Sequence, residues 1–406
     1  MLKQSINVHL TRKEIIKSGS VYTSPELVNL VFNQAQEFID GNTVIGDFGS
    51  GYGAFIEKFK NYGKRCFGTE CDDLAYNLLK NVYFDIDIYH ENSLLNVNRE
   101  KYSILEQDKL MIIGNPPYND TTSIFKKGEK GELICDSDLK SRDFGLSFLK
   151  AYNKLKADYI CVLHPLSYLI KKQNFTSLGD FKNNYKLISG TIFSSKEFES
   201  IKKNNSDFPV VSAIYKRDEK GMDYDFIRKF KFKIYREKGE FILSKVLTID
   251  GLVGKYPTSH KMNNNQNESN LTKQDQNKND LIHCLQFYTL RDMNSLLRNT
   301  GFVEGVIPNG IDVTLENLYQ YSWLYFLKIN FNPTINKFLY GNLSPLYSNK
   351  MNDSKFKSEV VYYAYYHCDL VKKYMNLEKI KSLYGPSPDQ YSAIFDELEN
   401  IYSLFV

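Results

Sequence analysis

Seven short apolar segments, separated by longer amphipathic ones, constrain the fold of this 406-residue chain more than any other feature. They fall within about the first 217 residues, and such alternation is typical of a parallel α/β sheet with helices on its faces. The sequence therefore predicts an α/β domain. The expected strands are 43–48, 65–70, 85–91, 110–115, 159–164, 187–193 and 210–216, and an expected helix runs from Pro25 to Phe38.

The character of the chain changes near residue 217, and residues 218–406 are expected to form a second, mixed α+β domain. Segment 226–245, FIRKFKFKIYREKGEFILSK, alternates basic and apolar side chains, which predicts half-buried antiparallel strands. Residues 261–280 are nearly devoid of apolar side chains, which predicts a disordered Asn-rich loop. Tyr-rich segments follow, and their periodicity does not distinguish helix from strand.

The charge, the cysteine spacing and the lengths of the apolar runs limit the class of protein. The net charge of +4 permits a polyanionic partner without requiring one. The six cysteines show no Cys-x-x-Cys or paired Cys/His spacing, so we expect reduced thiols and no metal. No run approaches the roughly 18 apolar residues of a membrane span. These observations favour a soluble cytoplasmic protein.

A glycine-rich segment, DFGSGYGAF (47–55), follows the first expected strand and opens a helix. Its glycines allow a tight turn and a close approach of ligand to backbone. Gly49-x-Gly51-x-x-Ala54 also satisfies the dinucleotide fingerprint, although turn-forming glycines alone would explain the pattern. The segment therefore indicates a nucleotide-like cofactor without naming it.

Three polar residues at strand ends narrow that choice. Asp47 would repel a pyrophosphate, whereas it would attract the ammonium and sulfonium groups of S-adenosylmethionine. Glu70, about 20 residues on, can accept hydrogen bonds from ribose hydroxyls. The amide oxygen of Asn92 can accept one from the adenine amine, with a plain turn residue as an equal alternative.

The fourth expected strand ends in MIIGNPPYND (111–120) and delivers Asn115, Pro116, Pro117 and Tyr118 to the same edge of the sheet. Asn and Pro also punctuate ordinary turns. As chemistry, the Asn115 side-chain oxygen and the Pro116 carbonyl can accept both hydrogens of a planar amine, making its lone pair available. Pro117 stiffens this pair, and Tyr118 offers a ring for stacking. The pattern predicts direct methyl transfer without a metal.

The order of these motifs resembles that of the gamma group of bacterial DNA adenine-N6 methyltransferases. The likeness covers about the first 217 residues. It implies a seven-stranded mixed sheet, S-adenosylmethionine as donor, an adenine flipped out of double-stranded DNA, and a C-terminal target-recognition domain. The segments that carry it are Tyr22-Thr-Ser-Pro25, DFGSGYGAF, GTECDD, ENSLL, IIGNPPY, DFGLSFLKAYNKL, ICVLHPLSYLI and FPVVSAIYK.

The resemblance implies a role for each matching residue. Tyr22 and Thr23 correspond to the segment that closes over the methionine moiety, and Asp47, Gly49 and Gly51 correspond to the cofactor loop. Glu70 corresponds to the acid that binds the ribose. The catalytic loop corresponds to Asn115, Pro116, Pro117 and Tyr118, and Asn115 is also expected near the cofactor. Asn92 stands where the group usually has Asp. Phe193, ahead of Phe198, is expected to stack on the flipped base, with core packing as a near-equal alternative. Phe148 is expected either in the core or lining the adenine pocket.

The expected function is site-specific adenine-N6 methylation of DNA, within a restriction-modification pair or alone. A restriction endonuclease acting on the same site is then a further expected partner. The alternatives are a methyltransferase acting on an RNA base amine or a protein glutamine amide, and an inactive methyltransferase-like subunit that binds DNA. Residues expected to contact phosphates, or else to form a solvated charged face, are Lys171, Lys172, Arg228, Lys229, Lys231 and Lys233. The long polar segment 119–142, which contains Lys126, Lys127 and Lys130, is expected either to be disordered or to become ordered on DNA.

Overall fold

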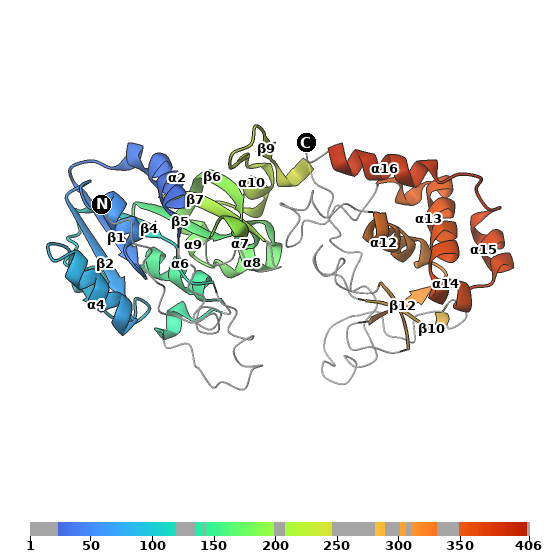
Figure 1. The fold of residues 1–406 in the computed structure, drawn as a ribbon, viewed down its shortest axis with the longest axis horizontal. Helices are drawn as coiled ribbons and strands as arrows, with labels where there is room; N and C mark the ends of the chain where they lie inside the picture. The colour runs from blue at the N-terminus through green and yellow to red at the C-terminus, as the bar shows by residue number, and fades with distance from the viewer. Residues whose placement is uncertain are drawn as a thin grey trace. The chain divides into compact units, whose positions relative to one another are not determined.

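A computed structural model describes residues 23–118, 135–141, 143–198, 208–245, 281–288, 301–305, 310–330 and 349–403. The chain divides into two compact units, Met1–Ile242 and Leu243–Val406 (Figure 1). The first unit thus extends past the boundary expected near residue 217. The Asn-rich loop expected at 261–280 lies outside the described residues.

A nine-stranded sheet forms the first unit, in the order β3-β2-β1-β4-β5-β7-β6-β8-β9. Strands β3, β2, β1, β4 and β5 pair in parallel, whereas β7 is antiparallel to both β5 and β6. The first seven strands therefore make the predicted mixed sheet. Their bounds are β1 Thr43–Phe48, β2 Arg65–Glu70, β3 Asp87–His90, β4 Lys109–Gly114, β5 Tyr159–Pro165, β6 Tyr185–Ser194 and β7 Pro209–Arg217.

The sheet has nine strands where seven were expected. The two additional strands, β8 (Phe232–Ile234) and β9 (Glu240–Phe241), come from segment 226–245, which was expected to lie in the second domain. Strand β8 pairs in parallel with β6, and β9 pairs with β8. The alternating pattern was correct for these strands, but it carries no information about which sheet they join.

The start of the same segment is helical, which corrects the strand expected there. Helix α10 spans Tyr224–Lys229, and the Asp223 side chain caps it by accepting a hydrogen bond from Phe226 N at 2.7 Å. Lys229 then forms an ion pair with Asp225 at 2.6 Å, one helical turn away. These local contacts favour helix over the period-two pattern.

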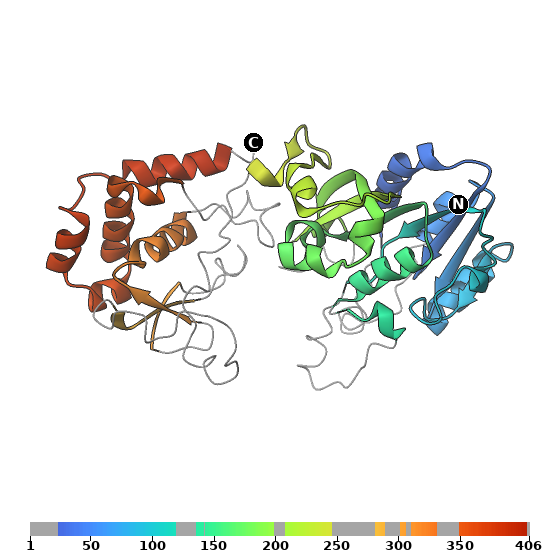
Figure 2. The same cartoon turned by 180° about the vertical axis from the view of Figure 1, so that it is seen from behind.

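Helices cover both faces of the sheet (Figures 1 and 2). On one face, α2 (Pro25–Ala35) and α3 (Ala54–Phe59) pack their apolar side chains against β1, β4 and β5. Pro25 occupies the first turn of α2, as predicted, where its missing N–H costs nothing. The other helices of this unit are α4 Asp73–Val82, α6 Phe144–Lys154, α7 Ser167–Ile170, α8 Lys172–Ser177 and α9 Phe181–Asn184.

On the opposite face, Phe48 and Phe67 point away from α2 because side chains alternate along each strand. Phe48 contacts Tyr102 edge-on, with ring centroids 5.2 Å apart, and lies 5.7 Å from the Tyr152 ring of α6. Both faces of the central strands are therefore buried, which explains their continuously apolar sequences.

The second unit contains a three-stranded antiparallel sheet in the order β11-β10-β12, together with helices. The Tyr-rich segment whose periodicity was ambiguous forms α13, whose N-terminus is capped by Asp353. The elements are β10 Leu281–Tyr288, β11 Phe302–Glu304, β12 Gly310–Thr314, α12 Leu318–Asn330, α13 Ser354–His367, α14 Asp369–Tyr374, α15 Leu377–Tyr384 and α16 Ser392–Ser403. Among the described helices of the chain, none has both the length and the apolar character needed to cross a membrane.

Candidate functional site

The carboxyl ends of three neighbouring parallel strands bring together the residues expected to carry the chemistry. Asp47 lies near the end of β1, Glu70 ends β2, and Asn115 follows β4 directly. Strand β1 pairs with both β2 and β4, and Asp47 lies in register with Ile113, two residues before Asn115. The structure therefore gathers these three residues at one edge of the sheet.

The loop after β1 turns through glycines with left-handed backbone conformations. Gly49 has φ 79° and Gly51 has φ 56°. The main-chain N–H groups of Gly49 and Ser50 both donate to the Thr69 carbonyl, at 3.0 and 2.8 Å. Gly49 and Gly51 thus allow the tight turn expected from the sequence, and hydrogen bonds to β2 hold it in place.

Asp47 carries a buried carboxyl group at the end of β1. Its side chain is 1% exposed, and within the described part of the chain neither carboxylate oxygen accepts a hydrogen bond. Burial and the neighbouring Glu70 carboxylate raise the pKa of Asp47 to about 8, and the Ser50 hydroxyl, which donates to the Asp47 main-chain carbonyl at 2.9 Å, offsets only part of this rise. A buried acid in this state is stabilised by a cation placed beside it. This position therefore fits a ligand that carries an ammonium group.

Glu70 points toward the glycine loop. Its Oε2 accepts a hydrogen bond from Gly51 N at 2.8 Å, and its Oε1 accepts bonds from Cys71 N and Asp72 N, both at 2.8 Å. Burial raises the pKa of Glu70, whereas these three N–H groups lower it. The carboxylate is held in one orientation and keeps lone pairs suited to hydroxyl donors.

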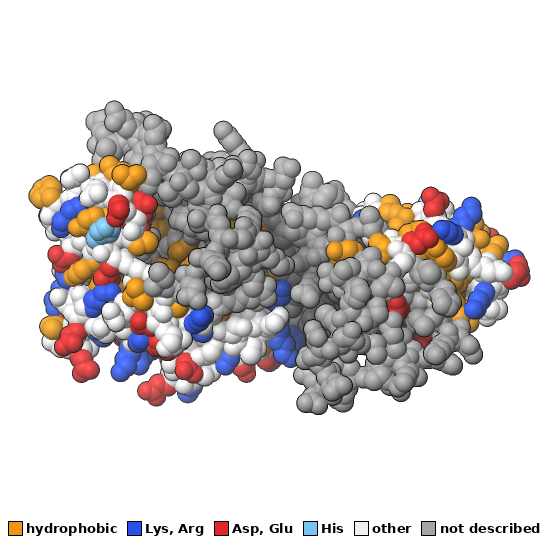
Figure 3. Space-filling model, turned by 90° about the horizontal axis from the view of Figure 1, so that it is seen from below, with side chains coloured by type: hydrophobic (Ala, Val, Ile, Leu, Met, Phe, Trp, Pro, Cys, Tyr) orange, Lys and Arg blue, Asp and Glu red, His pale blue; other side chains and the backbone are white. Residues whose placement is uncertain are grey.

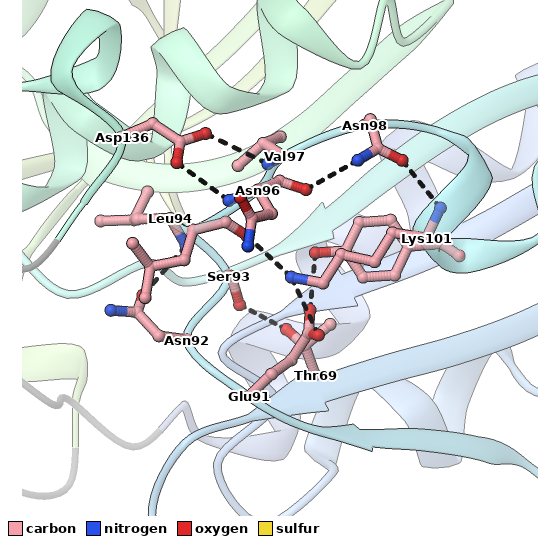
Figure 4. A network of polar contacts seen from close by, with 12 residues as sticks. Thr69, Glu91, Asn92, Ser93, Leu94, Asn96, Val97, Asn98, Lys101 and Asp136 are labelled. Carbon is pink, nitrogen blue, oxygen red and sulfur yellow. Dashed lines mark hydrogen bonds and ion pairs between the residues drawn. The ribbon is translucent and has the colours of Figure 1, made fainter.

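Asn92 lies in the turn after β3, where its side-chain oxygen accepts a hydrogen bond from Leu94 N at 2.9 Å (Figure 4). Its neighbour Ser93 bonds through its hydroxyl to the Thr69 hydroxyl at 2.5 Å. The turn role of Asn92 is thus present in the structure. Its contact with an adenine amine stays a prediction.

Asn115 and Tyr118 contact each other directly. The Tyr118 hydroxyl donates a hydrogen bond to Asn115 Oδ1, the oxygen expected to accept from the target amine. On its other side, Asn115 Nδ2 donates to Thr23 Oγ1 at 3.0 Å. Thr23 therefore lies beside Asn115, whereas Tyr22 is outside the described residues. A contact of Thr23 with the methionine moiety stays a prediction. Pro116 and Pro117 separate the two contacting side chains along the chain.

Gly114 is a site residue that the sequence analysis missed. Its φ of 142° is unfavourable for residues with a side chain, and a Cβ added there would lie 2.8 Å from Asp47 Oδ1. The glycine immediately before Asn115 was the available signal, because glycine next to a conformationally restricted turn often marks a close approach of two groups.

A second group of missed residues lies beyond Tyr118. The Tyr168 hydroxyl donates to Asp143 Oδ1, and Gly145 N donates to the same oxygen at 2.9 Å. The ring of Tyr168 stacks on His164, with centroids 5.3 Å apart. His164 is fully buried, its Nε2 lies 2.7 Å from the Tyr215 hydroxyl, and burial lowers its pKa to about 4. These residues brace the end of β5 against the start of α6.

The phenylalanines expected near the flipped base are buried. Phe193 is 3% exposed and lies in the core cluster on the α2 face, where it contacts Phe198 edge-on at 5.7 Å. Phe198 is fully buried, and Phe148 is 6% exposed within α6. Core packing thus describes all three positions. Stacking of Phe193 on a base stays a prediction that requires this packing to rearrange.

Three of the basic residues expected at phosphates, Arg228, Lys229 and Lys231, have acidic neighbours in the structure. Lys229 pairs with Asp225 at 2.6 Å, and Lys231 pairs with Glu240 at 3.4 Å. Figure 3 shows basic and acidic side chains interspersed over the described surface of the first unit. Lys126, Lys127 and Lys130 lie outside the described residues. The described residues contain no cluster of three or more His, Cys, Asp or Glu side chains that could hold a metal ion.

Comparisons with known proteins reach the fold only. No protein-family model matches the chain, and no curated protein sequence matches it. Among solved structures, it is similar to a candidate RNA methyltransferase from Pyrococcus horikoshii, with 13% identity over 50% of this chain and 88% of that one and a TM-score of 0.34. It is also similar to a 23S rRNA methyltransferase, with 9% identity over 50% and 71% of the two chains and a TM-score of 0.33.

A further likeness is to a SAM-dependent methyltransferase from Anabaena variabilis, with 11% identity over 51% of this chain and 92% of that one and a TM-score of 0.33. The order and direction of the first seven strands confirm the predicted fold class. The first unit thus has the seven-stranded mixed sheet that the resemblance implies, extended by two strands.

Proposed function

We propose that the chain is an adenine-specific DNA methyltransferase that transfers a methyl group from S-adenosylmethionine to the exocyclic N6 amine of a flipped-out adenine in double-stranded DNA. The observation that carries the proposal is that Asn115 directly follows Gly114, the residue that adjoins the buried Asp47 carboxyl group. Asn115 is suited to hold an amine, and Asp47 is suited to a cationic donor. Both lie at the carboxyl edge of the sheet, where open α/β sheets bind ligands.

The residues at this edge fit S-adenosylmethionine, which supplies an electrophilic methyl group on a sulfonium when bound. Asp47 would pair with the ammonium of the methionine moiety, and this pairing would restore the ionised state that burial disfavours. Glu70 would accept the ribose hydroxyls, and Asn92 would accept the adenine amine. Thr23, which accepts a hydrogen bond from Asn115, would belong to the segment before β1 that closes over the methionine moiety.

Asn115 and Pro116 would prepare the acceptor amine. The Asn115 side-chain oxygen and the Pro116 carbonyl would each accept one of its N–H bonds, and the lone pair would become available to the methyl carbon. The new N–C bond would form as the C–S bond breaks, and a proton would leave the nitrogen for solvent. Positioning of the two reactants supplies much of the rate in such a transfer.

Tyr118 has two parts in this proposal. Its ring would stack on the extruded base, which offsets part of the few kcal/mol that unstacking costs. Its hydroxyl at present donates to the Asn115 oxygen that the amine needs. Binding of the amine would therefore replace the Tyr118 hydroxyl at that oxygen.

The choice of DNA over other acceptors is supported by the second unit, Leu243–Val406. Methyltransferases that act on protein glutamine amides or RNA guanine amines are generally shorter, whereas a DNA enzyme needs a domain for target recognition. The alternatives remain an RNA base amine, a protein glutamine amide, or an inactive subunit that binds DNA. A restriction endonuclease with the same target site, and a location in the cytoplasm, belong to the proposal.

The test is a tritium-transfer assay with labelled S-adenosylmethionine and three acceptors: double-stranded DNA, RNA and release-factor protein. The proposal expects label in DNA, lost in Asn115→Ala. Sequencing of host DNA with a method that detects N6-methyladenine would then give the target site. Label in protein or RNA alone would overturn the DNA assignment, and an absence of label in all three would favour the inactive subunit.

A further inference from the structure

Asp136 ties the segment after the catalytic loop to the turn after β3. Its carboxylate accepts hydrogen bonds from Asn96 N at 2.9 Å and from Val97 N at 3.2 Å (Figure 4). Its own main-chain N–H donates to the Leu94 carbonyl at 2.8 Å. Three hydrogen bonds, running in both directions, therefore connect Asp136 to parts of the chain about 40 residues earlier.

The turn that Asp136 holds contains a strained residue. Asn96 has φ 52°, a left-handed conformation that costs free energy in residues with a side chain. Such a conformation persists where surrounding contacts fix it, and the Asn96 N–H is one of the groups that Asp136 binds. Without the carboxylate, the turn would be free to relax.

The same turn leads into the expected cofactor site. Asn92 accepts a hydrogen bond from Leu94 N, and Ser93 bonds to the Thr69 hydroxyl. Thr69 in turn accepts the main-chain N–H of Gly49, in the glycine loop. A continuous set of hydrogen bonds thus runs from Asp136 through the turn to the glycine loop.

We propose that Asp136 is a positioning residue that holds the turn of Asn92 in the geometry required for cofactor binding. This inference rests on the proposed function and deepens it. Within the described residues, the hydrogen bonds and ion pairs of the Asp136 side chain go to the turn and to Lys154 and not to the glycine loop, so it acts through the turn. Asp136 follows β4 in sequence, so its hydrogen bonds also connect the part of the chain after the proposed catalytic loop to the expected cofactor site.

The competing explanation is an ion pair of purely structural value. Lys154 Nζ lies 3.1 Å from Asp136 Oδ2 and 3.0 Å from Asp138 Oδ2. The two acids differ in their other contacts. Asp136 is 18% exposed and binds the turn, whereas Asp138 is 56% exposed and, within the described residues, its side chain pairs with Lys154 alone. Asp138→Ala is therefore a matched control that removes an ion pair and leaves the turn intact.

The experiment is a calorimetric titration of the full chain with S-adenosylmethionine, together with steady-state kinetics on DNA. For Asp136→Ala we expect affinity and KM for the cofactor to worsen by about 3- to 10-fold, because the competent turn is less populated. The kcat at saturating cofactor should stay within about twofold of the wild-type value. Asp138→Ala should match wild type in both measurements. If the role of Asp136 were purely structural, Asp136→Ala would lower kcat and thermal stability, and the effect would not be confined to affinity and KM for the cofactor.

Asp136→Asn provides a second variant should the alanine variant not fold, since an amide oxygen keeps part of the bonding to the turn. Its affinity is expected between those of wild type and Asp136→Ala. Equal affinity in wild type and both Asp136 variants, or an equal loss in Asp136→Ala and Asp138→Ala, would overturn the inference. Wild-type protein that does not bind S-adenosylmethionine would instead overturn the proposed cofactor, and this inference with it.

Discussion

Gly114 and the Asp47 carboxylate adjoin so closely that a Cβ on Gly114 would lie 2.8 Å from Asp47 Oδ1. Because Gly114 also has φ 142°, Gly114→Ala should suffer both a clash and backbone strain. We expect a loss of about 1 to 3 kcal/mol in the free energy of unfolding and weaker cofactor binding. Urea unfolding and calorimetry measure the two effects.

Gly41→Ala is the control for that substitution. No atom lies within 4 Å of a Cβ added at Gly41, and its backbone is not in the glycine-only region. Its stability should stay within about 0.5 kcal/mol of wild type. Equal behaviour of the two variants would show that the space beside Asp47 tolerates a methyl group.

Asp47→Asn should change stability and cofactor affinity in opposite directions. Near pH 8, the asparagine removes a buried charge that has no partner among the described residues, so the free protein should gain about 1 to 3 kcal/mol. Affinity for S-adenosylmethionine should fall at least about tenfold, because an amide does not attract an ammonium as a carboxylate does. Reduced stability with unchanged affinity would contradict the proposed role of Asp47.

The pH dependence of wild type follows from the same group. The pKa of Asp47 rises from 3.8 to about 8 on folding, so between these values the folded state keeps a proton that the unfolded state has released. As pH rises through this window, this group lowers the free energy of unfolding of the free protein by up to about 1.4 kcal/mol per pH unit. Cofactor affinity should instead increase toward pH 8. In Asp47→Asn, the contribution of this group to the pH dependence of stability and of cofactor affinity should be lost.

Asn115→Ala should abolish methyl transfer, because the amine loses an acceptor that exposes its lone pair. We expect kcat to fall by at least about 10²-fold, as when a positioned hydrogen-bonding group is lost, with little change in DNA binding. A gel-shift assay measures DNA binding, and a tritium-transfer assay measures methyl transfer. Asn61→Ala, at an exposed position between α3 and β2, is the control. Unchanged turnover in Asn115→Ala would exclude the proposed mechanism.

Tyr118 allows the hydroxyl and the ring to be tested separately. Tyr118→Phe removes the hydroxyl that donates to Asn115, so KM for DNA should stay equal or decrease. Tyr118→Ala removes the ring as well, and binding of the extruded base should weaken by about 1 to 3 kcal/mol. Fluorescence of a DNA with 2-aminopurine at the target adenine measures extrusion. Equal effects of the two substitutions would rule out stacking.

His164 should make the protein less stable in acid. Burial lowers the pKa of His164 from 6.5 to about 4, so between these pH values the unfolded state binds a proton that the folded state does not bind. The free energy of unfolding should fall by up to about 1.4 kcal/mol per pH unit as pH drops toward 4. His164→Gln keeps a polar partner for Tyr215 and should lose this slope. His90→Gln, at an exposed position, should retain it.

Several elements of the fold were predictable because local signals agreed. The bounds of β1 and β2 match the expected segments, since each is a short apolar run that ends at a glycine or acidic turn. Helix α10 was missed because its Asp223 cap and its Asp225–Lys229 pair outweigh a period-two pattern. The pairing of β8 with β6 depends on a neighbour about 40 residues away, which no local pattern encodes.

The candidate site divides in the same way. Asp47, Glu70 and Asn115 were predictable because parallel strands present their carboxyl ends at one edge. Gly114 was missed, because its role depends on its backbone angle and on a side chain of another strand. The contacts of Asp136 were missed for a similar reason, since they connect two loops through main-chain groups that any residue type supplies.

The two additional strands have a consequence for behaviour in a crowded cell. Strand β6 has 10 residues, and β8 pairs with two of them, Thr191 and Ile192, so the extension covers part of an outer side whose N–H and C=O groups could otherwise pair with strands of other molecules. The sheet instead ends at β9, with two residues, and on the other side at β3, with four. A short edge strand offers few unpaired main-chain groups to strands of other molecules. Over the part of β6 that it covers, the extension of the sheet thus removes an edge at which another strand could pair.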